Sequence, residues 1–61
     1  MDPNANLREQ RELVKRIRMT TTDPERAAEL GEQLVDLVDA LDEWISKGGF
    51  LPNDWTSKSI E

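Results

Sequence analysis

One apolar repeat constrains the fold of this chain more than any other feature of its sequence. Between residues 24 and 47, apolar side chains recur at alternating steps of three and four, which places them on one face of an α-helix. The members of the repeat are Ala27, Leu30, Leu34, Leu37, Leu41 and Trp44. A repeat of this length predicts a helix over about residues 24–47, ended by Gly48-Gly49.

The same segment carries a second apolar line. It consists of Val35, Val38 and Ile45, together with the small residues Ala28 and Gly31. About half of the helix circumference is therefore apolar, which is more than one partner helix can cover. Asp23 is the expected N-cap of this helix, with Pro24 at its first position, where the missing N–H costs nothing.

A shorter amphipathic helix precedes it. Leu7, Val14 and Ile17 follow helical spacing and occupy an arc of roughly 100°. We expect this helix over about residues 6–19, capped by Asn6 or Asn4. The short connection to the next helix predicts an antiparallel arrangement. The expected fold is all-α: an antiparallel two-helix hairpin in a single domain over residues 1–55, with a C-terminal aromatic turn and a disordered tail over 56–61.

The two predicted helices differ in length. At 1.5 Å per residue the first spans about 20 Å and the second about 36 Å. Leu7 therefore reaches only as far as Leu37 or Val38. The residues beyond that level are Leu41, Trp44 and Ile45. They need a further cover, either the segment after the glycine pair or a second copy of the chain.

We therefore expect self-association through the second helix, as a dimer of two hairpins in a four-helix bundle. The residues expected to take part are Leu30, Leu34, Leu37, Val38, Leu41, Trp44 and Ile45. An aromatic group near the C-terminus either packs on the end of this bundle or forms a partner-binding surface, since Trp is enriched at binding hot spots. Its aromatic members are Trp44, Phe50 and Trp55, and Leu51 belongs to the same possible partner surface.

Charge is segregated between the two helices. Residues 7–19 hold five basic and two acidic residues, whereas residues 24–45 hold seven acidic and one basic. Four of the basic residues form a stripe beside the apolar face: Arg8, Arg11, Lys15 and Arg18. The stripe either contacts phosphate groups or pairs with acids of the second helix, in the same chain or in a partner copy. The net charge of −5 and the lack of interleaved aromatics favour pairing and argue against nucleic acid.

Composition narrows the function further. With no Cys and no His among 61 residues, there are no disulfides, thiolate ligands or histidine bases. No apolar run is long enough to cross a membrane, and the start of the sequence lacks the pattern of a signal peptide. We expect no catalytic residues, no cofactor and no metal site. The predicted function is non-enzymatic protein–protein interaction in the cytoplasm. The alternative is a nucleic-acid-directed regulator, which binds DNA through the basic stripe or mimics it through the acidic face of the second helix.

The C-terminal part resembles a signature of short uncharacterised helical proteins of actinobacterial phages. The signature joins LDEW, GGFLP and a later Trp, here residues 41–44, 48–52 and Trp55, to an Asn-rich start such as residues 3–7. The resemblance covers nearly the whole chain and is most specific over residues 41–55. It implies a phage origin and a bacterial host cytoplasm, with a host protein as a partner, but no mechanism. The three consecutive threonines and the long acidic face are not part of the signature.

Overall fold

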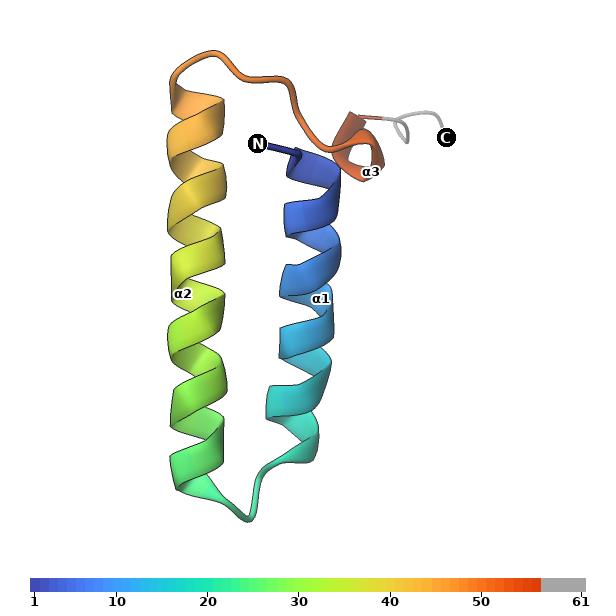
Figure 1. Ribbon diagram of the computed structural model, residues 1–61. Helices are drawn as coiled ribbons and strands as arrows, with labels where there is room; N and C mark the ends of the chain where they lie inside the picture. Colours follow the sequence, from blue (N-terminus) through green and yellow to red (C-terminus); the bar gives the residue numbers. More distant parts are fainter. Residues whose placement is uncertain (57–61) are drawn as a thin grey trace.

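The computed structural model describes residues 1–56, so the predicted disordered tail lies outside the described residues except for Thr56, which ends a short helix. The helices are α1 (Pro3–Met19), α2 (Pro24–Ser46) and α3 (Asn53–Thr56), and residues 1–56 contain no strand. α1 and α2 run antiparallel side by side, and the chain then crosses the end of the hairpin to bring α3 beside α1 (Figure 1). The predicted all-α hairpin is confirmed.

α1 begins three residues earlier than the sequence pattern predicted. Asp2 is its N-cap, because its Oδ1 accepts hydrogen bonds from the backbone N–H groups of Asn4 at 3.0 Å and Ala5 at 3.3 Å. Pro3 occupies the first position of the helix, where it has no N–H to leave unpaired. The predicted caps, Asn4 and Asn6, lie inside α1. The earlier start extends α1 further along α2.

α2 starts at the predicted residue and ends one residue early. Its C-terminus adopts a Schellman arrangement: the N–H of Gly48 bonds to the carbonyl of Ile45 at 3.0 Å, and that of Gly49 to the carbonyl of Trp44 at 2.8 Å. Gly48 has a φ of 95°, a region that favours glycine. The glycine pair therefore ends the helix and reverses the chain, as the sequence predicted.

The core of the hairpin is small. Within the described chain the buried side chains are Pro3, Asn6, Leu7, Leu13, Leu30, Leu41 and Pro52. Leu41 was expected to lie beyond the reach of α1 and to be covered either by the segment after the glycine pair or by a second copy. It is only 3% exposed in a single chain, because α1 starts early and the chain returns across this end of the hairpin (Figure 1). In the single chain Leu41 is therefore already covered without a second copy.

A buried asparagine sets the register of the two helices. The side-chain N–H of Asn6 donates to the carbonyl oxygen of Leu37 at 3.0 Å, and its Oδ1 accepts from Gln10 at 2.6 Å. Both polar ends of this side chain are therefore satisfied, as burial requires. Residue 6 lies level with residue 37, which agrees with the predicted reach of Leu7 along α2.

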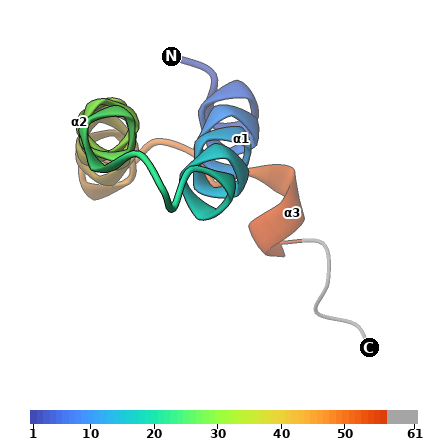
Figure 2. The ribbon, with the colours of Figure 1, turned by 90° about the horizontal axis from the view of Figure 1, so that it is seen from below.

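The hairpin is one helix layer thick. Its Cα extents are 38 × 28 × 13 Å, and the view along the helices shows α1 and α2 side by side, with α3 displaced to the outer side of α1 (Figure 2). Small domains ordinarily bury apolar side chains between two packed layers. A single layer has two broad faces instead, and what lies on each face decides what the hairpin can bind.

Candidate interaction surface

The apolar side of α2 consists of two seams with the same heptad spacing. The inner seam is Ala27, Leu30, Leu34, Leu37, Leu41 and Trp44. The outer seam is Ala28, Gly31, Val35, Val38, Asp42 and Ile45. The two are offset by one residue, or about 100° around the helix. The inner seam therefore meets α1, and the outer seam lies on one broad face of the hairpin.

Burial separates the two seams clearly. Leu30 of the inner seam is 2% exposed, whereas Val35 and Val38 of the outer seam are 62% and 47% exposed. Ala28 and Asp42 are also exposed, and Ile45 is half-buried. Isolated apolar side chains on a surface need no explanation, but neighbouring ones along one helical stripe, as Val35 and Val38 are, mark a candidate contact with another chain. Asp42 interrupts this stripe before Ile45.

Trp55 of α3 extends the apolar face. It lines a shallow hollow of about 210 Å³ together with Val38, Asp42 and Ile45 of the outer seam and Gln10 of α1. Its side chain is 49% exposed. The chain return therefore adds an aromatic edge to the outer seam near the end of the hairpin where α2 terminates.

The opposite broad face has a different character. A hollow between the two helices on that side is lined by Leu13 and Leu37 and is bordered by charged and amide groups. Its polar lining residues are Glu9, Glu12, Arg16, Gln33 and Asp36. All five are exposed. Charged and amide groups therefore surround the leucines of this hollow, whereas valines lie exposed on the outer seam.

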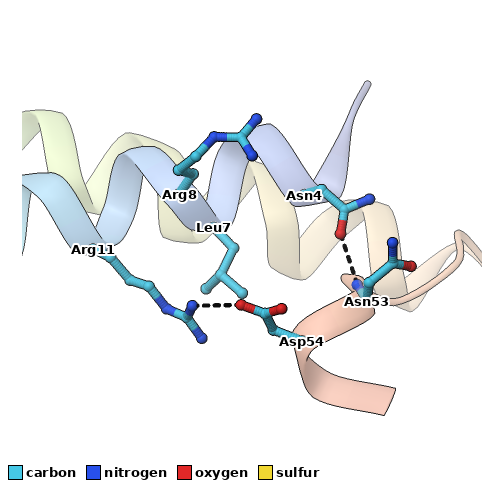
Figure 3. Close-up of a pocket in the computed structure, with 6 residues that line it drawn as sticks. All are labelled: Asn4, Leu7, Arg8, Arg11, Asn53 and Asp54. Carbon is cyan, nitrogen blue, oxygen red and sulfur yellow. Dashed lines mark hydrogen bonds and ion pairs between the residues drawn. The ribbon is translucent and has the colours of Figure 1, made fainter. Parts of the chain in front are cut away.

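Two polar contacts hold α3 on α1. The carboxylate of Asp54 pairs with Arg11 at 2.6 Å, and the N–H of Asn53 donates to Oδ1 of Asn4 at 2.7 Å. Leu7 lies between these contacts and points toward α3 (Figure 3). The sequence did not predict these two contacts, because the paired residues are 43 and 49 positions apart. Pairs so far apart produce no local pattern in the sequence.

The predicted aromatic surface is divided. Trp44 donates its indole N–H to the carbonyl of Phe50 at 2.9 Å, and the two rings meet edge to face at 5.6 Å. Phe50 and Leu51 remain exposed beside them. A Cβ at Gly49 would collide with the indole of Trp44, so the close approach of backbone and ring requires glycine. Trp55 is placed elsewhere, at the outer seam.

The predicted basic stripe is exposed along α1. Its members are Arg8, Arg11, Lys15 and Arg18. Within residues 1–56 the ion pairs are Arg11–Asp54, Arg26–Glu29 and Lys47–Glu43. None of these joins α1 to α2. The same-chain pairing considered for the stripe is therefore not formed in this part of the chain.

The seven residues predicted for self-association fall on both seams. Val38 and Ile45 belong to the outer seam, and the other five belong to the inner seam. Leu30 and Leu41 are fully buried, while Leu34, Leu37 and Trp44 are half-buried. Val35 and Trp55 were not among the seven, and the structure adds both to the exposed apolar face.

The described residues contain no cluster of three or more acidic side chains arranged to hold a metal ion. No helix in the described part of the chain is long and apolar enough to cross a bilayer. Comparison of the sequence and structure with protein-family models, curated proteins and solved structures gives no match.

Proposed function

We propose that this protein is a non-enzymatic interaction protein that self-associates through α2. The observation that carries the proposal is the outer seam, in which Val35 and Val38 lie exposed at the middle of a long helix. A single helix layer cannot enclose these side chains, whereas a second hairpin packed on the same face supplies the missing layer. Two hairpins then form the four-helix assembly expected from the sequence.

The size of the face suits this role. The broad side of the hairpin together with α3 measures 38 × 28 Å, which sets an upper limit of roughly 1,000 Å² on the contact, and a standard interface takes ~800 Å² from each partner. At about 25 cal/mol per Å², burying the exposed part of each central valine contributes ~1–2 kcal/mol. Trp55 at the edge of the face adds an aromatic side chain of the kind enriched in hot spots.

In this proposal the two seams have separate roles. The inner seam packs α2 against α1. This packing keeps α2 helical and leaves the outer seam accessible to a second copy. The outer seam, with Val38 and Ile45 from the predicted set and Val35 and Trp55 from the structure, makes the contact. The resemblance to short phage proteins is the sole support for a bacterial host as the setting, and for a host protein as a further partner.

The test compares one added carboxylate on each face of the hairpin. Val38→Asp places a charge in the outer seam, and Gln33→Asp places the same charge on the polar face of the same helix. We expect the unchanged chain to sediment as a dimer at tens of micromolar. Val38→Asp should weaken the dimer by about 100-fold or more, because an unpaired charge is buried there.

Gln33→Asp should leave the sedimentation coefficient unchanged, and far-ultraviolet circular dichroism should show equal helicity for all three chains. An unchanged chain that sediments as a monomer at these concentrations would overturn the proposal. Equal weakening by both substitutions would place the contact elsewhere and would overturn the role of the outer seam.

A further inference from the structure

The outer seam also determines how two copies are oriented, provided that the self-association proposed above occurs. We propose that the α2 helices of two copies pack antiparallel through the outer seam, with the twofold axis passing between Val35 and Val38. The partner is a second copy of this chain, and three features of the seam select this direction.

The first feature is the distribution of side-chain size along the seam. In an antiparallel pair the facing residues are Val35 with Val38, Gly31 with Asp42, and Ala28 with Ile45 of the second copy. Each large residue near one end then meets a small one, and the valines meet at the centre. A parallel pair would instead set each residue against itself, with crowding at Ile45 and a gap at Ala28.

The second feature is the single charged member of the seam. A parallel pair places Asp42 directly against Asp42 of the second copy, and like charges at facing positions repel. In the antiparallel pair Asp42 faces residue 31, eleven positions away. The two carboxylates are then about 16 Å apart along the helix axis, which exceeds the ~8 Å Debye length at physiological salt.

The third feature is Gly31. Its backbone does not require glycine, since Gly48 is the glycine with a positive φ. A Cβ at position 31 would meet nothing within 4 Å in the chain itself. Glycine disfavours a helix interior relative to alanine. The antiparallel pair gives this position a use, because the missing side chain leaves room for the Asp42 carboxylate of the second copy to keep its water. At the centre of the seam, where the valines meet, a carboxylate would have no such room.

The arrangement also brings together acids that flank the seam. Glu32 lies at nearly the same level as Asp39 of the second copy, and both side chains are exposed in the single chain. Neighbouring charges of one sign oppose association, and dissolved salt screens them. The affinity of the pair should therefore increase with ionic strength.

The chain contains no cysteine, so single thiols can report which residues face one another. We would mix full-length Ala28→Cys with Ile45→Cys under oxidising conditions and separate the products by mass. The expected product is the mixed disulfide. Two copies of residue 28 lie about 25 Å apart along the axis of the antiparallel pair, which exceeds the Cα separation of 4.4–6.8 Å that a disulfide allows.

A second pair, Gly31→Cys with Asp42→Cys, avoids any change to the half-buried Ile45 and should give the same preference for the mixed product. Gln33→Cys, on the polar face, provides the background level of cross-linking. Preferential homodimers of Ala28→Cys would show parallel helices and overturn the inference while leaving self-association intact. A chain that sediments as a monomer would overturn both proposals and leave the outer seam to a different protein.

Discussion

The inner and outer seams of α2 have the same spacing along one helix, yet they differ in what covers them. The inner seam is richer in leucine and ends at a tryptophan, and its members Leu30 and Leu41 are buried against α1 and the returning chain. The outer seam has valine and small residues, and its centre is exposed. Large flexible side chains fill the space between two helices of unequal length, whereas small and β-branched side chains form a shallow, stiff surface. Equal periodicity therefore gives a core on one side and a surface suited to docking on the other.

Leucine and valine truncations should separate the two seams most strongly. Leu30→Ala removes a 2% exposed side chain and should lower the free energy of unfolding by about 2–5 kcal/mol, enough to unfold much of so small a hairpin. Val35→Ala should change the stability of the monomer by less than about 0.5 kcal/mol. Both values can be measured by urea titration followed by circular dichroism, at protein concentrations below the dissociation constant of the dimer.

The order of the two variants should reverse when the affinity of the dimer is measured in place of the stability of the monomer. Among chains that remain folded, Val35→Ala should reduce the association constant measured by sedimentation. A Val35→Ala chain that loses as much monomer stability as Leu30→Ala would show that the outer seam is a core element, and the distinction between the seams would fail.

Gly31→Ala sharpens the comparison, because its two effects should have opposite signs. The added methyl group meets open space in the single chain, and alanine favours a helix interior by about 1 kcal/mol over glycine. Thermal unfolding of dilute protein should therefore show a higher Tm. The dimer should be weaker, because the methyl group occupies space facing Asp42 of the second copy. A gain in both quantities would indicate that no other chain approaches position 31 closely.

Salt should produce the smallest effect. Raising ionic strength from about 20 to 300 mM shortens the screening length and should tighten the dimer by about two- to threefold, because Glu32 and Asp39 repel their counterparts. Replacing both acids by their amides should abolish this dependence in sedimentation equilibrium. A dimer that weakens with salt would point instead to pairing between the basic stripe of α1 and the acids of α2.

The parts of the fold governed by local pattern could be predicted from the sequence. The repeat from Ala27 to Trp44 gave α2, and the glycine pair gave its end, because each acts on its immediate neighbours. The start of α1 was less predictable, since Asp2, Asn4 and Asn6 are all capable caps that differ by small energies. Pro3, immediately after Asp2, was the signal that could have decided among them.

The surface was less predictable than the helices. Clustering of all three aromatic residues within twelve positions indicated one group, but the turn at Pro52 sends Trp55 to the outer seam while Phe50 stays with Trp44. The contacts that hold α3, such as Arg11 with Asp54, join residues far apart in the sequence. The direction that the chain takes after a turn depends on such long-range contacts. They produce no periodic pattern in the sequence.

The polar lining of the second broad face has a consequence for assembly. A surface that pairs with its own copy through a twofold axis is fully used once two chains have met. The far hollow is bordered by charged and amide groups and does not repeat the valine surface of the outer seam. Pairing through the outer seam would therefore close the assembly at two chains instead of extending it into a filament.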